Sequence, residues 1–508
     1  MKLRNMKISI ILLMLIFLSV AYVCYAEDIY VGEATATEMS TYIPDVSETA
    51  LLQSETIYDR LYNGMINLES KINISDFGYS CENIKALNDA IITTLRMHYE
   101  LYYVSNVYGY SYELSGLILA ISPQYINTNK GEIDETIRLM ESKMEEILSY
   151  TDESMNDVQK LMAVYDQLIL RSYYDSYFSQ STVKDLLLNG TVVCEGYART
   201  LYALAEKMGI KSGFVHSDKL NHVWNAIYID GAWYHADATW DDTNRVNDPC
   251  ATHEYFLKSN DWFMNESENR HYDFILLEND SDKYDDAFWT NVKSPIITIA
   301  GQMYYISGTV ANWGISVYNS FTEETTRINN LSEYWYCGPD KRAYWIGVYS
   351  GLAYKDGRLY FNTENNILSC KLDGTDIKQE FYFSDKNSSI YGCFEQDGVL
   401  YYAFNAKKDY PYTDSQKNCY AFPEMTNNKF ALSSVFEKDG KRYISYDNYS
   451  GDNCTIMIFT KSGNRITSVD VISVSSGKQI TETDISSDKY EIIVLNNGFM
   501  PLTDKLVC

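Results

Sequence analysis

Residues 220–242 read "LNHVWNAIYIDGAWYHADATWDD" and predict a β-hairpin. Two apolar, aromatic-rich runs flank Asp230-Gly231, and an Asp-Gly pair between alternating strands is the strongest short-range signal for a two-residue type I′ turn. A turn of this type fixes the register of the two strands, so we expect Ile229 to pair with Ala232.

The predicted register brings polar residues together on one face of this hairpin. Trp224 lies opposite Asp237, and the alternation of side chains along a strand keeps His222 on the same face. His222 and Asp237 become diagonal neighbours about 7–8 Å apart, a gap that polar side chains can close. The carboxylate would hold the imidazole in one tautomer and favour its protonated form. A His–Asp pair of this kind is most often structural, so catalysis requires a nucleophile from elsewhere.

One candidate nucleophile lies upstream, in "LLLNGTVVCEGYARTLYALAEKMGI" (186–210). An apolar stripe from Ala198 to Met208 predicts a helix that ends at Gly209, which puts Cys194 at or near its N-terminus. Backbone N–H groups and the helix dipole stabilise a thiolate there, and the same N–H groups can hold an oxyanion during acyl transfer. The alternatives are that Cys194 is a small buried residue or half of a disulfide.

These stretches, together with "YYD" at 173–175, resemble the core of the transglutaminase-like superfamily in its exported bacterial branch. That family uses a papain-like Cys-His-Asp arrangement on an α+β fold. The resemblance implies that Cys194 is the nucleophile, His222 the general base and acid, and Asp237 the residue that orients His222. The interval between Cys194 and His222 is shorter than in the calcium-dependent animal enzymes, so calcium dependence and animal-type crosslinking are not implied.

Three further residues are candidates for substrate binding. Gly196 leaves room for substrate or for close packing, Trp224 is one of several tryptophans that line a cleft or pack in the core, and Tyr174 is a candidate second oxyanion donor.

No metal site and no cofactor are expected. The chain has no C-x-x-C pair, and His216 and His253 have no metal-binding spacing. Asp241, Asp242 and Asp248 are interpreted as a solvated acidic loop rather than a cation site.

The composition limits the classes of partner. The chain has 508 residues, is 46% hydrophobic and carries a formal net charge of −27. This composition is typical of a globular protein, and the negative charge argues against binding to nucleic acid or anionic membranes.

The first 26 residues predict a secretory signal peptide. A basic start is followed by an uncharged apolar run over 8–23, and small Ala26 precedes the acidic pair Glu27 and Asp28. The apolar run is shorter than the roughly 20 residues of a membrane-spanning helix, so cleavage is favoured over an uncleaved anchor. We therefore expect a secreted, extracellular or cell-surface protein without stable membrane insertion after cleavage.

The cysteine count fits an oxidising compartment. Of ten cysteines, nine remain once Cys24 is removed with the signal. If one is a working thiol, the other eight can form up to four disulfides.

Periodicity divides the rest of the chain. Apolar spacing predicts helices over 50–70, 81–103, 132–150 and 153–171, and tyrosine-rich strands over 104–127. We assign 27–280 to the transglutaminase-like domain with a helical N-terminal extension.

From 285 onward the pattern is all-β. Hairpins with an Asp-Gly turn recur at 352–363, 393–404 and 435–446, which predicts propeller-like repeats over 285–425. Alternating strands over 430–508 predict a C-terminal β-sandwich.

Two classes of function follow. The first is an exported thiol enzyme that transfers or hydrolyses acyl groups of amide bonds through a Cys194 thioester, acting on extracellular proteins or peptides, including cell-wall peptides. The sequence leaves hydrolysis and transamidation open. The second is a catalytically silent extracellular binding or scaffold protein that uses its β-modules.

Overall fold

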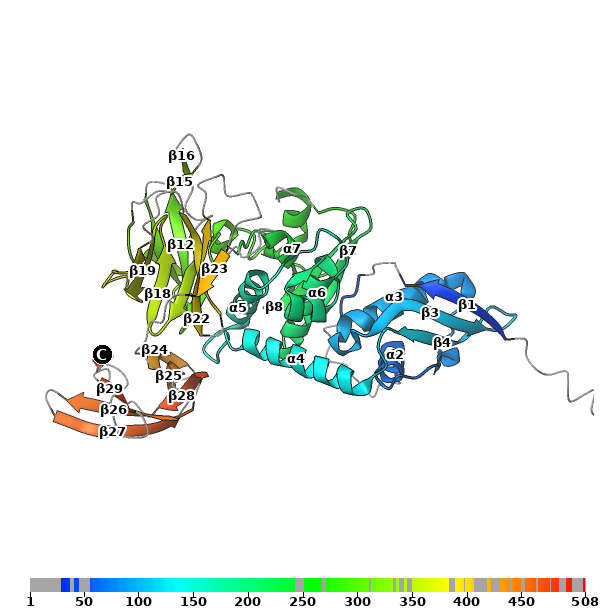
Figure 1. Ribbon diagram of the computed structural model, residues 1–508, viewed down its shortest axis with the longest axis horizontal. Coiled ribbons are helices and arrows are strands. Elements are labelled where there is room, and N and C mark those ends of the chain that lie inside the picture. The colour runs from blue at the N-terminus through cyan, green and yellow to red at the C-terminus, as the bar shows by residue number, and fades with distance from the viewer. Residues whose placement is uncertain are drawn as a thin grey trace, which may run out of the picture. The chain divides into compact units, whose positions relative to one another are not determined.

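A computed structural model divides the chain into two compact units, residues 1–40 with 45–135 and residues 41–44 with 136–508 (Figure 1). The residues that the structure describes are 29–36, 41–44, 55–242, 251–266, 271–309, 312–331, 335–337, 342–344, 350–382, 389–396, 398–405, 418–421, 430–438, 441–448, 453–462, 465–475, 477–483, 490–495 and 506–507. The predicted signal peptide lies outside them.

The first unit is a small α+β fold around a sheet in the order β1-β3-β4-β2. Its strands are β1 (Tyr30–Thr35), β2 (Ile72–Asn73), β3 (Val104–Tyr112) and β4 (Ile118–Tyr125), and its helices are α2 (Ile57–Ile66) and α3 (Ile84–Met97). The stripe of α3 that includes Leu87, Ile91 and Leu95 is buried, as its spacing predicted. Both helices are confirmed but are shorter than predicted; Thr56 and Asp59 start α2 with a capping box.

The second unit contains the predicted catalytic elements. Helix α4 (Lys130–Leu148) belongs to this unit from Thr136 onward. Helices α5 (Asp157–Leu170) and α6 (Cys194–Lys207) follow it and precede a sheet in the order β10-β9-β8-β7. The strands are β7 (Ser212–Ser217), β8 (His222–Ile229), β9 (Ala232–Ala236) and β10 (Phe256–Lys258). Helix α6 packs against β8 and α5 (Figure 1). This packing places the first residue of α6 close to the sheet.

The predicted hairpin is β8–β9. Asp230 and Gly231 have φ values of 54° and 81°, as a type I′ turn requires, and Ile229 pairs with Ala232. The strand ends one residue earlier than the prediction needed, because Asp237 starts a short helix, α7 (Ala238–Asp241).

A second pair of strands precedes the start of α6. Strand β5 (Tyr173–Tyr174) runs parallel to β6 (Thr191–Val192), and Gly190 ends the preceding π-helical turn with φ 71°. This pairing places the segment after Tyr174 beside the residues that lead into Cys194.

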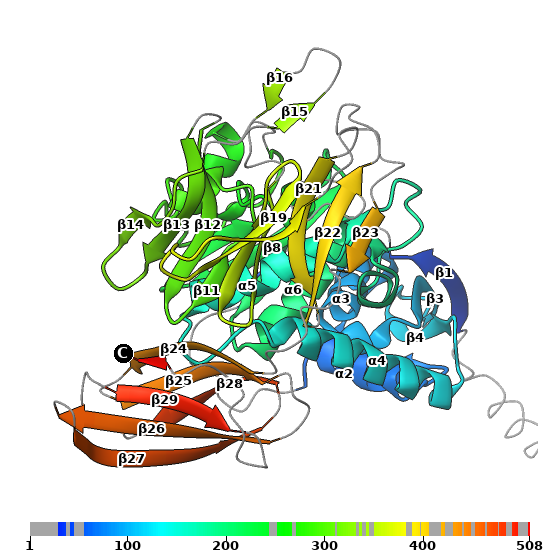
Figure 2. The same ribbon diagram turned by 60° about the vertical axis from the view of Figure 1, so that its left-hand side comes forward.

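From β11 onward, the described strands form antiparallel sheets. The first three have the orders β11-β12-β13-β14, β17-β18-β19-β20 and β21-β22-β23 (Figure 2). Their bounds are β11 Ile297–Ile299, β12 Gln302–Thr309, β13 Asn312–Asn319, β14 Glu324–Arg327, β17 Leu352–Lys355, β18 Arg358–Asn362, β19 Asn366–Lys371, β20 Lys378–Tyr382, β21 Ser389–Gln396, β22 Val399–Asn405 and β23 Asn418–Ala421; β15 (Trp335–Cys337) pairs with β16 (Arg342–Tyr344).

These three sheets share cores through their faces. One face of the middle sheet packs against the first sheet, with Tyr354 and Phe361 in a cluster that includes Trp313. The other face packs against the third sheet, with Tyr360 beside Tyr402. The hairpin predicted at 352–363 is confirmed, with its turn at Asp356-Gly357.

Two further sheets end the chain, in the orders β24-β25-β28 and β27-β26-β29-β30. Their bounds are β24 Phe430–Lys438, β25 Lys441–Asn448, β26 Cys454–Ser462, β27 Arg465–Val474, β28 Gly477–Thr483, β29 Tyr490–Leu495 and β30 Leu506–Val507. Ile444 of the first and Ile456 of the second lie in one buried cluster. The turn predicted at Asp439-Gly440 lies outside the described residues.

The boundary predicted near 285 is crossed by buried hydrogen bonds. The amide of Ile296, just before β11, donates to Asp166 Oδ2 at 2.7 Å, and Gln159 Nε2 donates to the Gly301 carbonyl at 3.1 Å. Helix α5 therefore contacts the start of the first β-sheet, and the domain limits given above remain predictions.

The upper limit of four disulfides is not reached. Cys81, Cys370 and Cys393 carry free thiols, so the eight cysteines cannot all be paired. Burial raises the pKa of Cys370 to about 12, as expected for a small residue packed in an apolar sheet core.

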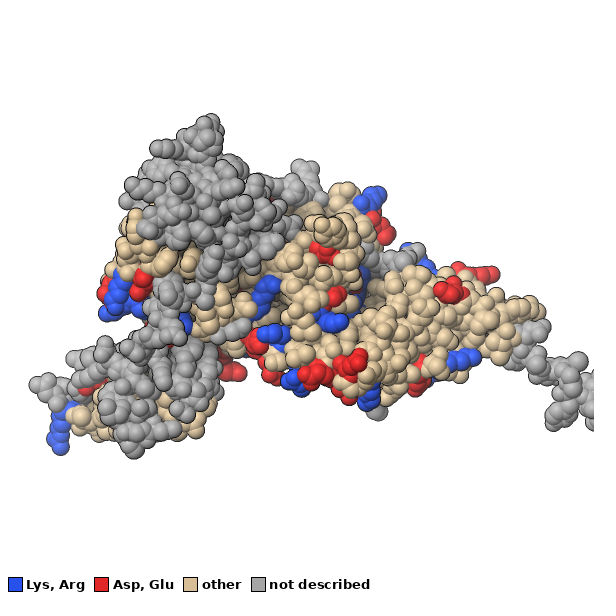
Figure 3. Space-filling view, in the orientation of Figure 1, with Lys and Arg blue, Asp and Glu red and all other residues tan. Residues whose placement is uncertain are grey.

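The described surface carries charges of both signs. Lysine and arginine side chains are interspersed with aspartate and glutamate on the face shown in Figure 3. Among the described residues, no helix combines the length and the apolar character that crossing a bilayer requires.

Candidate active site

Cys194 is the first residue of α6, as predicted. Its side chain is buried, and Val193 before it makes no side-chain capping bond. The N–H groups of the first helical turn have no acceptor within the helix, so that of Cys194 can point at an anionic atom beside the sulfur. Helix α6 is fixed against the hairpin because Asn225 Nδ2 donates to the Ala198 carbonyl at 2.9 Å.

Gly196 serves close packing, one of the two roles predicted for it. A Cβ at this position would lie 1.8 Å from Cγ2 of Val192 in β6. The space that a side chain at position 196 would occupy is therefore taken by Val192, and no room is left there for substrate. Gly196 holds the start of α6 close to the strand that precedes it.

His222 and Asp237 form the predicted pair. His222 Nε2 lies 2.5 Å from Asp237 Oδ2, and both side chains are buried. The ring also interacts with the Cys194 thiol, and since Nε2 is taken by Asp237, Nδ1 is the nitrogen left for the sulfur. Burial alone would lower the pKa of His222, but Asp237, with a smaller contribution from Cys194, raises it to about 10. An imidazolium is therefore the stable form at neutral pH.

Asp237 uses its two oxygens separately. Oδ1 accepts from the amides of Thr239 and Trp240 at the start of α7, while Oδ2 accepts from His222 and also from His271 Nε2 at 2.9 Å. Burial opposes ionisation, but the two histidines hold the pKa of Asp237 well below its usual range. Sequence reasoning missed His271, because it lies far along the chain on a segment without a strand or helix period.

Aromatic rings surround His222. The rings of Trp224 and Trp240 stack on it, at centroid distances of 5.6 and 5.4 Å. Trp224 Nε1 donates to His235 Nδ1 at 3.0 Å, and His235 Nε2 lies 3.0 Å from Asn260 Oδ1. Trp224 therefore contacts the predicted general base directly, and a buried chain of hydrogen bonds sets its orientation.

Tyr174 lies near the thiol. Burial raises the pKa of its hydroxyl to about 12, and Cys194 adds to this rise, so the phenol stays a hydrogen-bond donor at neutral pH. The loop after it is rigid because Asp175 accepts bonds from the amides of Tyr177, Ser179 and Gln180. These features are compatible with the role of oxyanion donor predicted for Tyr174.

The acidic loop prediction is wrong for two of its three residues. Asp241 and Asp242 are buried, and they accept hydrogen bonds from the hydroxyls of Tyr165 and Tyr197. Burial raises the pKa of Asp241 to about 6. Both carboxylates anchor the helices behind the site, and Asp248 lies outside the described residues.

Two further histidines, His253 and His216, have carboxylate partners. His253 is buried, with Nε2 2.7 Å from Asp166 Oδ1, and His216 Nε2 lies 3.2 Å from Asp218 Oδ1. Of the described residues, one group could bridge a metal ion: donor atoms of His222, Asp237 and His271 lie within 4.8 Å of one another. In this arrangement the carboxylate oxygen accepts from both imidazoles, so the group is a hydrogen-bonded cluster.

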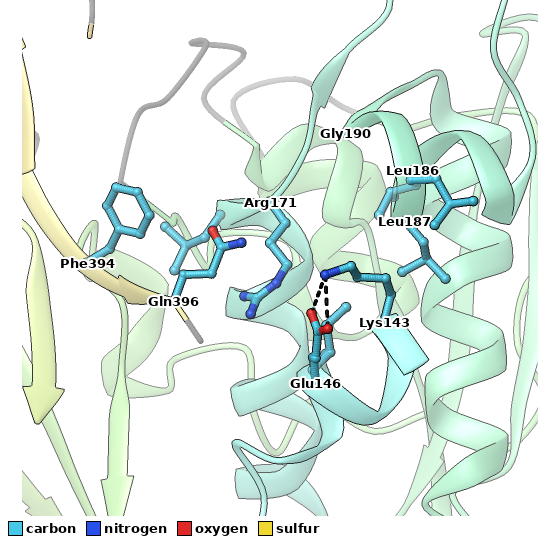
Figure 4. A pocket seen from close by; sticks show the side chains of 11 residues that line it. Lys143, Glu146, Arg171, Leu186, Leu187, Gly190, Phe394 and Gln396 are labelled. Atoms are coloured by element: carbon cyan, nitrogen blue, oxygen red, sulfur yellow. Dashed lines mark hydrogen bonds and ion pairs between the residues drawn. The ribbon is translucent and has the colours of Figure 1, made fainter. Parts of the chain in front are cut away.

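A separate cavity of about 210 Å³ is lined by ends of α4 and α5, the π-helical turn and β21. Figure 4 shows the Lys143 ammonium pointing at the carboxylate of Glu146, which lies about one turn further along α4; the two groups are 2.6 Å apart. Arg171, which also lines the cavity, donates to Gln167 and lies over the ring of Tyr150. Each of these three charged side chains therefore has a protein partner, and none of the three predicted catalytic residues lines the cavity.

The cluster can carry out nucleophilic acyl chemistry. A thiol at a helix N-terminus, an imidazolium beside it and a buried carboxylate behind the imidazole reproduce the nucleophile, acid–base and orienting roles of a catalytic triad. The fold brings these three residues together from the start of α6, the start of β8 and the N-cap of α7.

Comparisons with known proteins point to the same region. Residues 146–238 match the family described as the transglutaminase-like superfamily. Kyphoscoliosis peptidase of Homo sapiens is 24% identical over 120 residues, which cover 20% of this chain and 18% of the human protein. Its Mus musculus counterpart is also 24% identical, over 122 residues. The match thus spans less than a fifth of these curated relatives.

Two solved structures are similar over a quarter of the chain. One is described as a TGase, with 14% identity and a TM-score of 0.19, covering 26% of this chain and 43% of that one. The other is a putative cysteine protease from Cytophaga hutchinsonii, with 18% identity and a TM-score of 0.18, covering 26% and 53%.

Proposed function

Residues 146–238 of this chain form a domain of the transglutaminase-like superfamily, and from this we propose that the protein is an exported thiol enzyme acting on amide bonds of peptides or proteins. The observation that carries the proposal is the convergence of Cys194, His222 and Asp237 at one buried point. An imidazolium beside a thiol at a helix N-terminus is the arrangement that activates a cysteine nucleophile, which favours the enzyme over the binding protein.

In the first step, the Cys194 sulfur attacks the carbonyl carbon of the amide. The N–H of Cys194 and the phenol of Tyr174 donate to the oxyanion that forms. His222 then gives the proton on Nδ1 to the departing nitrogen, the C–N bond breaks, and a thioester remains on Cys194. Asp237 keeps the second ring nitrogen, Nε2, protonated and oriented throughout.

In the second step, neutral His222 takes a proton from the acceptor as it attacks the thioester. Water as acceptor releases a carboxylic acid, and an amine releases a new amide, with the thiol restored in both cases. We favour hydrolysis or general acyl transfer over crosslinking, because the interval between Cys194 and His222 is shorter than in the animal crosslinking enzymes.

The substrate is expected outside the cell. The predicted signal peptide supports export, and exported peptides or cell-wall peptides are then the accessible amides.

For the β-region we propose propeller-like repeats, supported by one sheet packed through both faces. A two-sheet sandwich, supported by the shared core of β25 and β26, would follow. Both modules would present substrate to the thiol domain.

The test is alkylation of the folded protein with iodoacetamide between pH 4 and 9, with each cysteine quantified by mass spectrometry. We expect Cys194 to be labelled rapidly below pH 7, and His222→Ala to abolish this. Cys81, a partly exposed free thiol, is the internal reference. A Cys194 profile that follows Cys81 in the native protein would overturn the proposal. An active profile would justify a screen of peptide substrates.

A further inference from the structure

We propose that His271 is a positioning residue for the catalytic cluster, one that keeps Asp237 an anion so that the His222 proton goes to the leaving group. The inference rests on the proposed function, since it assigns a role within the same site. The sequence motifs do not include this residue, and it lies outside the segment 146–238 that matches the family model.

The placement of His271 is specific. Its Nε2 lies 2.9 Å from Asp237 Oδ2, the same oxygen that accepts from His222, and its side chain has no exposed surface. The backbone amide of His271 donates to the Phe263 carbonyl at 3.0 Å. A residue held at both its backbone and its ring defines where the carboxylate oxygen can sit.

Ring contacts fix the imidazole plane. The His271 ring lies 3.9 Å from Trp240, 4.4 Å from Phe263 and 4.7 Å from Trp224, measured between centroids. Two of these rings, Trp224 and Trp240, are the ones that stack on His222. His271 therefore supports both partners of the catalytic dyad, the carboxylate by hydrogen bonding and the imidazole through shared aromatic neighbours.

A second donor on Oδ2 changes what Asp237 can do. In a dry site, a carboxylate with a single imidazolium partner competes for the shared proton, and a captured proton would leave both groups neutral. An additional N–H on the same oxygen stabilises the anion and weakens its affinity for that proton. His222 then remains the group that holds the mobile proton, on the nitrogen that faces Cys194.

Other titratable groups face this cluster. Cys194 comes from α6, His235 from β9, Tyr165 from α5 and Tyr174 from β5, and each has an electrostatic interaction with a member of the cluster. The two tyrosines and His235 are uncharged between pH 4 and 9, because burial raises the pKa of each tyrosine and lowers that of His235 to about 3. They therefore contribute no titration of their own in the proposed test.

The experiment compares His271→Leu with His271→Gln in the full chain, by the pH profile of iodoacetamide labelling at Cys194. Leucine removes the donor, whereas glutamine keeps an N–H at a similar reach. The matched control is His253→Leu, which removes another fully buried histidine whose carboxylate partner is Asp166 rather than Asp237. Urea unfolding of all three variants measures the loss of stability separately.

For His271→Leu we expect the acid limb of the labelling profile to move up by about one pH unit, equal to about tenfold slower labelling at pH 5. His271→Gln should restore most of the rate, and His253→Leu should lose stability without moving the limb. A leucine profile that overlays the native one, or a shift equal to that of His253→Leu, would overturn the inference. If Cys194 of the native protein had the same labelling profile as Cys81, the proposed function itself would be refuted, so the two failures are distinguishable.

Discussion

At the scale of single residues, His235 is a histidine that the fold keeps uncharged. It is fully buried, accepts from the Trp224 indole through Nδ1 and faces Asn260 through Nε2. Burial lowers its pKa to about 3. An unfolded chain binds a proton at this residue below about pH 6.5, so the unfolded state holds more protons than the folded state between about pH 3 and 6.5. Folding stability from this residue therefore rises with pH in that window.

We expect His235→Asn, which keeps an acceptor for Trp224, to flatten this dependence. The slope of unfolding free energy against pH should fall by up to one proton, about 1.4 kcal/mol per pH unit, between pH 5.0 and 6.5. Urea unfolding at four pH values in that range measures it. His253→Gln is the contrast: Asp166 outweighs burial and raises the pKa of His253, so this residue's contribution is lost above pH 6.5 instead. Equal slopes for the native protein and His235→Asn would refute the assignment.

The predicted catalytic residues could be found from sequence because each has a local signal. Cys194 follows a turn and opens an apolar stripe, and His222 and Asp237 flank an Asp-Gly hairpin. His271 has no such signal. Its relation to Asp237, 34 residues away, depends on how the segment after β10 folds back, and no spacing rule encodes that.

At the scale of elements, the contact of β6 with α6 determines where the thiol sits. Gly196 and Val192 are in direct contact, so a side chain at 196 must push the helix start away from the strand. We expect Gly196→Ala to cost about 1–3 kcal/mol of unfolding free energy, as overpacking does, and to slow Cys194 labelling. Adding Val192→Ala removes the clashing methyl and should recover part of both losses. Urea unfolding and labelling of the single and double variants measure them.

Gly131→Ala is the matched control for this prediction. Gly131 is also helical, but the nearest atom to its added Cβ is 3.6 Å away. Alanine there should stabilise by about 0.5–1 kcal/mol, because it lowers the entropy of the unfolded chain. If Gly196→Ala behaved like Gly131→Ala, the tight approach of α6 to β6 would be disproved.

Turn and cap chemistry explains which elements were predictable. The Asp-Gly turn fixed the register of β8 and β9, and an Asn156–Gln159 capping box starts α5 near the predicted helix at 153–171. The end of β9 was missed because Asp237 uses one oxygen to cap α7, which ends the strand. The pair Asp241 and Asp242 looked solvated because their partners, Tyr165 and Tyr197, come from other helices.

At the scale of the whole molecule, helix α5 and the first β-sheet depend on each other. Asp166 accepts from the Ile296 amide, and His253 Nδ1 lies 3.1 Å from the Val292 carbonyl. We expect a chain that ends at residue 285 to have a lower urea midpoint than one that ends at 429. Its free energy of unfolding should be lower by about 1–3 kcal/mol for each buried group left without its partner. Equal midpoints for the α-helical signal by circular dichroism would show that the domain limit at 285 is real.

The sequence indicated an all-β region after 285, and Asp-Gly turns located its hairpins. It gave no sign that the first of these sheets joins the thiol domain, because the bonds involved connect a helix to backbone groups about 130 residues later. A change in composition and in the spacing of apolar residues marks a boundary along the chain. Whether two segments pack together depends instead on pairs of atoms that only the folded backbone brings together.

The Asp166–Ile296 bond has a consequence for hydrogen exchange. An amide in a link between modules normally exchanges through small local openings. The Ile296 amide, in contrast, is buried and donates to the carboxylate of Asp166 in a core helix. Its proton should exchange only when α5 itself opens, and so at the rate of the slowest amides in that helix. The β-region would then have no independent hinge at this point, and motions that admit substrate must arise elsewhere in the chain.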